Sequence, residues 1–87
     1  MAGRVFLVED DAEVRALLAR HLRRRGYTVE EAADGVEALS LAEKGVPDVV
    51  VTDMAMPRLD GLGLLKALRQ MDPELPVIIL TGQGSFE

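Results

Sequence analysis

Four short hydrophobic runs alternate with three longer amphipathic stretches along this 87-residue chain. Each hydrophobic run has the length of a β-strand, whereas the stretches between them carry apolar residues at helical spacing. Strands that alternate with helices of about 10–15 residues indicate βαβ units, right-handed crossovers and a parallel sheet covered on both faces. The pattern therefore predicts one α/β domain. The expected strands are Val5–Val8, Tyr27–Ala32, Asp48–Asp53 and Pro76–Leu80.

The three expected helices each begin at or just after an aspartate that can cap them. They run from about Ala12 to Arg25, from Asp34 to Lys44 and from Asp60 to Met71. Residues at helical spacing on each of them are expected to face the core. In the order of the three helices, the expected buried residues are Val14, Leu17, Leu18, His21 and Leu22; Val36, Leu39 and Ala42; and Leu64, Leu65 and Leu68.

The strands differ in composition. Val49–Val51 is a β-branched run without polar residues, which suits a strand buried on both faces. Tyr27–Ala32 contains two adjacent acids and little apolar content, so we expect it at an edge of the sheet.

Composition excludes several classes of function. The net charge of −5 gives no support to direct nucleic-acid binding and fits a cation or a basic partner better. The absence of cysteine excludes disulfides and thiolate metal sites. No apolar run approaches the roughly 18–20 residues of a membrane span, and the N-terminus lacks the hydrophobic part of a signal peptide. We therefore expect a cytoplasmic protein without a membrane segment.

Polar groups end three of the four strands: Glu9-Asp10, Asp53 and Thr81. The carboxyl ends of parallel strands share one edge of the sheet, where open α/β folds place their chemistry. Three carboxylates gathered there repel one another unless a cation intervenes, and Mg²⁺ is a cation that binds carboxylate oxygens. The hydroxyl of Thr81 could donate to an anionic oxygen beside the metal. Together these groups describe a carboxylate that could accept a phosphoryl group.

Three segments of the chain resemble the receiver domain of two-component response regulators. The spacing between the acidic pair, the aspartate and the threonine also matches, and the resemblance covers essentially the whole chain. The segments are Phe6–Asp11, Asp53–Pro57 with the following Asp60-Gly61, and Pro76–Thr81.

The resemblance implies a role for each site residue. Asp53 falls on the phosphoacceptor, and Thr81 falls on the hydroxyl residue that follows the phosphoryl group. Asp10 would bind Mg²⁺ directly, Glu9 would act through water, and the main-chain carbonyl of Ala55 would be a further metal ligand. The phosphoryl group would come from a sensor histidine kinase, and the domain would act as a conformational switch rather than as a turnover enzyme.

Two other functions stay open at this point. The first is a Mg²⁺-dependent phosphohydrolase with an aspartyl nucleophile, although that chemistry generally needs a second acid where this chain has Ala55. The second is a pseudo-receiver that serves only as a protein-interaction module. The output is open as well, with transcription regulation and fusion to a kinase as possibilities.

The resembling family has a flavodoxin-like (CheY-like) sheet of order 2-1-3-4-5, whereas residues 1–87 contain four expected strands. The fifth strand, the lysine that ends it and the last two helices are missing, so we expect a receiver domain that is incomplete on its C-terminal side. In the order 2-1-3-4 the apolar strand Pro76–Leu80 would lie at an open edge, which favours association. The first helix would lie alone on its face beside an apolar patch. We therefore expect self-association or segment exchange between chains.

Overall fold

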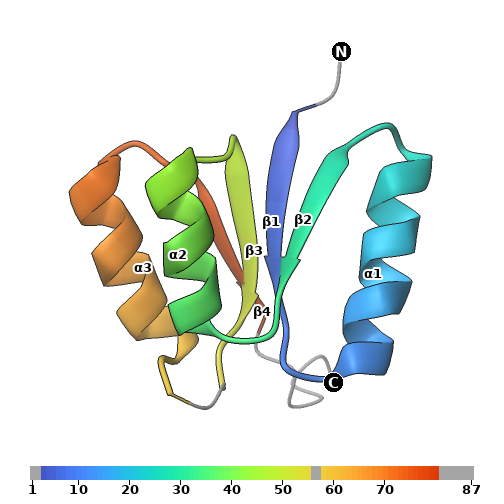
Figure 1. Cartoon of the computed structure of the whole chain (residues 1–87), viewed down its shortest axis with the longest axis horizontal. Helices are drawn as coiled ribbons and strands as arrows, with labels where there is room; N and C mark the ends of the chain where they lie inside the picture. Colours follow the sequence, from blue (N-terminus) through green and yellow to red (C-terminus); the bar gives the residue numbers. More distant parts are fainter. Residues whose placement is uncertain (1–2, 56–57, 81–87) are drawn as a thin grey trace.

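A computed structural model of the protein describes residues 3–55 and 58–80. Within them strands and helices alternate along the chain as predicted (Figure 1). The strands form one parallel sheet in the order β2-β1-β3-β4, which confirms the expected topology. The elements are β1 (Arg4–Val8), α1 (Ala12–Arg24), β2 (Thr28–Ala32), α2 (Gly35–Lys44), β3 (Val49–Asp53), α3 (Gly61–Met71) and β4 (Val77–Leu80).

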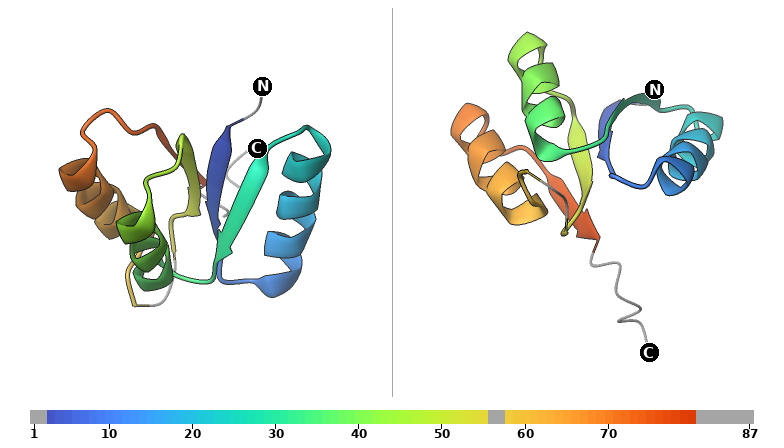
Figure 2. Two further views of the ribbon diagram at one scale, coloured as in Figure 1. Left: turned by 45° about the horizontal axis from the view of Figure 1, so that its top comes forward. Right: turned by 60° about the horizontal axis from the view of Figure 1, so that its bottom comes forward.

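The helices cover the two faces of the sheet unequally. α2 and α3 lie side by side on one face, and among the described elements α1 is the one that lies on the other (Figures 1 and 2). The larger apolar cluster lies beneath α2 and α3 and includes Phe6, Val50, Leu64 and Leu68, all fully buried. A smaller cluster beneath α1 joins Val5, Leu7, Ala19 and Val29.

The buried stripe predicted for α1 was only partly right. Leu18 and Leu22 pack against the smaller cluster as expected. Val14 is 41% exposed, Leu17 is 59% exposed, and His21 is also exposed, so the expectation was wrong for these three. The reason is the placement of α1, which packs against β1 and β2 rather than over the centre of the sheet. One flank of the helix therefore meets no other element among the described residues.

The stripes of the other two helices were predicted better. Leu64 and Leu68 of α3 are fully buried and Leu65 is half-buried. In α2, Ala42 is buried and Leu39 packs against the larger cluster. Val36 of the same helix is 43% exposed, so the prediction that it faces the core was wrong.

On the face of the sheet that carries α1, apolar side chains of β3 and β4 are partly exposed. Val50 is fully buried under α2 and α3, but Val49 and Val51, on the opposite face of β3, are only half-buried. On β4, Ile78 is 52% exposed and Leu80 is 37% exposed. Among the strands that the structure describes, β4 is the last in the order of the sheet, so it is the apolar edge strand that the sequence predicted.

Candidate functional site

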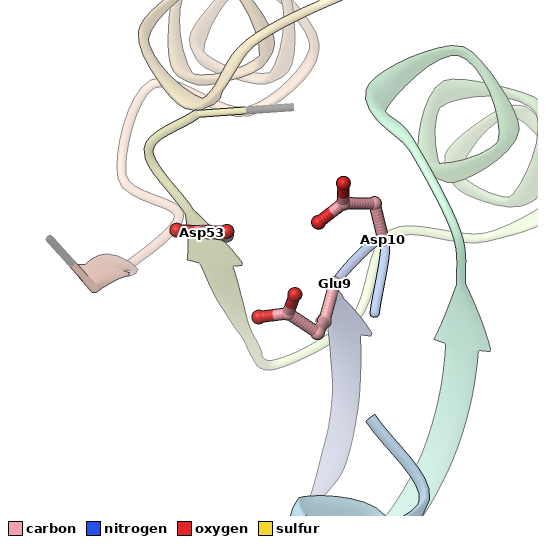
Figure 3. Close-up of side chains that lie close together, drawn as sticks. All are labelled: Glu9, Asp10 and Asp53. Atoms are coloured by element: carbon pink, nitrogen blue, oxygen red, sulfur yellow. The ribbon is translucent and has the colours of Figure 1, made fainter. Parts of the chain in front are cut away.

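The carboxyl ends of β1 and β3 bring three acidic side chains together. β1 and β3 are adjacent and pair Val8 with Thr52, so Glu9-Asp10 and Asp53 leave the sheet side by side. One carboxylate oxygen from each of the three residues lies within 4.8 Å of the others. Figure 3 shows the three side chains around one space at this end of the sheet.

The backbone at the acidic pair is fixed from both sides. The Glu9 N–H donates to the Ala32 carbonyl of β2 at 3.0 Å, which continues the ladder past β1. Nη1 of Arg15 donates to the Glu9 carbonyl at 2.8 Å, and Nε of the same guanidinium lies 3.4 Å from the Glu31 carboxylate. Arg15 thus ties the turn after β1 to the neighbouring strand.

Asp11 completes this turn as the N-cap of α1. Its carboxylate accepts from the N–H groups of Glu13 at 2.9 Å and Val14 at 3.2 Å, so its charge serves the helix. Its own N–H donates to the Glu9 carboxylate at 3.0 Å. The predicted capping role of Asp11 is confirmed.

Glu9 lies in surroundings that disfavour its charged form. Burial is the main reason that its pKa is raised above the ordinary value, and the nearby Asp53 and Asp10 carboxylates act in the same direction. The hydrogen bond from the Asp11 N–H opposes this shift but does not cancel it. A cation placed among the three carboxylates would remove the repulsion.

Asp53 is held by the chain that returns to it after a loop. The Met54 N–H donates to the Leu80 carbonyl at 3.0 Å, and the Gly61 N–H donates to the Met54 carbonyl at 2.9 Å. A side-chain carbon at position 61 would lie 2.5 Å from the Asp53 carbonyl oxygen, so only glycine allows this close approach. From the sequence, Gly61 was expected only at the start of the third helix, without this contact to Asp53.

The structure brings together some of the predicted site residues and not others. Glu9, Asp10 and Asp53 lie together, and Ala55 is exposed on the loop that follows β3. Thr81 lies outside the described residues. The contacts of Arg15 and the approach of Gly61 to Asp53 were not predicted, because tertiary packing creates them and no motif spacing marks them.

Comparison with known proteins identifies the family. Residues 5–87 match the model of the response regulator receiver domain. The chain belongs to this family. It is 48% identical over 85 residues to the response regulator MprA of Mycobacterium sp. (strain KMS), a match that covers 98% of this chain and 37% of that protein.

Solved receiver domains agree in fold. The receiver domain of the hybrid histidine kinase CckA is 46% identical, with a TM-score of 0.87, and the match covers 95% of this chain and 79% of that one. The response regulator TrrA of Thermotoga maritima, solved in complex with Mg²⁺-BeF, is 31% identical with a TM-score of 0.88, over 100% of this chain and 75% of that one. The fold is therefore the flavodoxin-like fold of CheY-like receiver domains. No described helix is long and apolar enough to cross a membrane.

Proposed function

We propose that this receiver domain accepts a phosphoryl group on Asp53 from a sensor histidine kinase and relays it as a conformational switch. The observation that carries the proposal is the cluster of Glu9, Asp10 and Asp53, whose carboxylate oxygens lie within 4.8 Å of one another at the ends of adjacent strands. Membership of the receiver family supports the same function.

The donor set fits Mg²⁺. All three side chains offer hard oxygen ligands. Burial raises the pKa of Glu9 most, and the neighbouring Asp53 and Asp10 carboxylates raise it further by a repulsion that a divalent cation relieves. Asp10 and Asp53 would hold the ion directly together with the main-chain carbonyl of Ala55, and Glu9 would act through water. The Mg²⁺-BeF complex of the related TrrA supports this choice of metal.

In the proposed reaction a carboxylate oxygen of Asp53 attacks the phosphorus of a phosphohistidine. An oxygen–phosphorus bond forms, the phosphorus–nitrogen bond breaks, and the freed imidazole nitrogen takes up a proton. When bound, Mg²⁺ supplies the positive charge that stabilises the transferring phosphoryl group. The contacts of Arg15 and Gly61 hold the two strand ends that carry the reacting groups. The hydroxyl of Thr81 would move toward the new phosphoryl group and change the position of the residues that follow it in the chain.

The chain spans about two-fifths of the length of the MprA proteins that it matches, so the output of the whole protein is a separate question. We expect the site to be used in the cytoplasm, where it meets the kinase. The open edge at β4 would allow self-association, and the expectation that residues 1–87 are one part of a longer receiver domain stays a prediction.

Incubation with acetyl phosphate distinguishes the candidate functions. We expect Mg²⁺-dependent, stoichiometric incorporation of phosphate that hydrolyses slowly, is blocked by EDTA, and persists in a Glu43→Gln control on the exposed face of α2. Rapid turnover of a small phosphate ester that Asp53→Asn abolishes would instead establish a phosphohydrolase. The absence of both incorporation and turnover would leave a pseudo-receiver and refute the proposal.

A further inference from the structure

An ion pair fastens the loop between β3 and α3 to the beginning of α2. Nε and Nη2 of Arg58 both donate to Oδ2 of Asp34, at 3.0 and 2.5 Å. The two residues are 24 positions apart in the chain, so the pair joins two loops that only the fold brings together. The Arg58 side chain is 60% exposed, whereas the Asp34 side chain is 13% exposed.

Asp34 is a fixed anchor in this pair. Its other oxygen, Oδ1, accepts from the Glu37 N–H at 2.8 Å and caps α2, while the Glu37 carboxylate accepts from the Ala33 N–H at 2.6 Å. The Glu37 N–H and, after it, Arg58 hold the pKa of Asp34 below its usual value. One oxygen thus serves the helix and the other is available to the loop.

The backbone conformation of Arg58 is unfavourable without a contact that stabilises it. Its φ of 70° lies in the left-handed region, and it is the one residue other than glycine with a positive φ in the described part of the chain. A side chain with a Cβ adopts this conformation at a cost in free energy, unless its surroundings compensate. The two hydrogen bonds from the Arg58 guanidinium to Oδ2 of Asp34 provide that compensation.

The next residue strengthens the attachment. A side-chain carbon at position 35 would lie 2.6 Å from the Leu59 carbonyl oxygen and 2.8 Å from the Leu59 Cβ, so Gly35 lets the loop lie directly against the start of α2. The side chain of Leu59 also packs against the larger apolar cluster. Arg58 and Leu59 therefore attach the same stretch of loop to α2 by charge and by packing.

In the chain, Ala55 lies two residues after the end of β3 and three residues before Arg58. We propose that Arg58 and Asp34 are a positioning pair for the metal site, which hold the loop so that the Ala55 carbonyl is available to Mg²⁺ beside Asp10 and Asp53. This inference rests on the proposed function and extends it to two residues that touch none of the reacting groups.

Two substitutions separate positioning from folding. Asp34→Asn keeps an oxygen to cap α2 but removes the charge that Arg58 binds, since asparagine and aspartate cap helices about equally well. Arg58→Gly removes the guanidinium and also relieves the left-handed backbone, so it lowers stability less than the loss of the ion pair alone would. Arg24→Ala, at the exposed end of α1, is the matched control.

The experiment is a titration of the metal-free 87-residue protein with MgCl₂, followed by the NMR amide signals of Asp10 and Ala55. Asp34→Asn and Arg58→Gly should each raise the half-saturating Mg²⁺ concentration roughly three- to tenfold. This effect is no larger than the smallest usual loss of metal affinity, about tenfold, when a residue that supports a metal ligand is replaced. Because both substitutions break the same ion pair, the double variant should bind Mg²⁺ as weakly as the weaker-binding single variant. In the absence of Mg²⁺, amide hydrogen exchange at Ala55 should be faster in all three than in the Arg24→Ala control.

Unchanged half-saturation in both single variants, with a wild type that binds Mg²⁺, would overturn the positioning role and leave the proposed function intact. A wild type that does not bind Mg²⁺ would overturn both. The third outcome is a loss of Mg²⁺ affinity that is proportional to the loss of thermal stability in every variant, Arg58→Gly included. That result would show that the pair has a purely structural role.

Discussion

Glu9 carries a carboxylate that the fold buries beside two other acids. Because its pKa is raised, the folded state holds a proton on Glu9 more tightly than the unfolded chain does. The stability associated with this proton is complete below the ordinary pKa of 4.5 and is lost as pH rises through the raised value. In the metal-free protein the acidic cluster therefore costs stability at neutral pH.

Replacing the Glu9 carboxylate should stabilise the metal-free protein and weaken its binding of Mg²⁺. We expect Glu9→Gln to raise the free energy of unfolding of the metal-free protein at pH 7, because it removes a buried charge whose pKa burial and the neighbouring carboxylates raise. The stabilisation should shrink toward acid pH, and added Mg²⁺ should stabilise the variant less than the wild type. Urea unfolding between pH 4 and 8, with and without Mg²⁺, measures both effects, and identical pH profiles for the two proteins would contradict the account.

Gly61 gives a second test at the scale of single residues. In Gly61→Ala the new Cβ meets the Asp53 carbonyl oxygen, so β3 or α3 has to shift. We expect a loss of roughly 1–3 kcal/mol in stability, together with weaker Mg²⁺ binding, because the strain falls on Asp53, the proposed phosphoacceptor. Gly63→Ala, in the same helix but against the side chain of Leu59, is a useful comparison. Equal effects of the two variants on Mg²⁺ binding would argue against a special role for the Gly61 contact.

The acidic cluster was predictable from the sequence because it follows from strand ends alone. Parallel strands place their carboxyl ends together, so Glu9, Asp10 and Asp53 could be assigned to one place once the strands were recognised. The Arg58–Asp34 pair was not predictable in this way. Asp34 was expected to open α2 and does so, but the use of its second oxygen depends on a left-handed residue in a distant loop.

At the scale of elements, α3 has a strongly buried face and an exposed one. Leu64 is fully buried and Leu62, two residues earlier, is 47% exposed. We expect Leu64→Ala to lower the free energy of unfolding by about 2–5 kcal/mol, since it leaves a cavity under the helix. Leu62→Ala should change it by less than about 0.5 kcal/mol. Guanidinium unfolding at matched protein concentration compares the two, and similar losses would mean that α3 is packed differently from the structure.

α1 shows what periodicity leaves open. Helical spacing placed Leu18 and Leu22 correctly on the buried face. Val14, Leu17 and His21 of the predicted stripe remain exposed because α1 lies over β1 and β2. A spacing pattern identifies residues that share a helix face. It does not say which edge of that face a neighbouring element covers, since this depends on where the helix crosses the sheet.

The described part of the molecule is asymmetric, because α2 and α3 cover one face of the sheet and, within residues 3–55 and 58–80, α1 is the one helix on the other (Figure 2). Ile78 and Leu80 on the open edge strand β4 lie on the less covered side. Edge strands without charged residues tend to pair with other chains. The 87-residue chain should therefore associate with a second copy as its concentration rises.

A charge on β4 should prevent this association. Sedimentation velocity of Ile78→Lys should show a weaker concentration dependence than the wild type, with an apparent dissociation constant at least about tenfold higher, equivalent to about 1.4 kcal/mol. Ser40→Lys, exposed on α2, should behave like the wild type. A wild-type chain that stays monomeric and unfolds in one sharp two-state transition would contradict the expectation.

The identity of the phosphorylated residue is the most direct test of the central claim. After incubation with acetyl phosphate and Mg²⁺, borohydride reduction converts an aspartyl phosphate to homoserine, and peptide mass spectrometry then locates it. We predict that homoserine appears at position 53 in the wild type and at no position in Asp53→Asn. Homoserine or phosphate at another residue, with position 53 unmodified, would contradict the account.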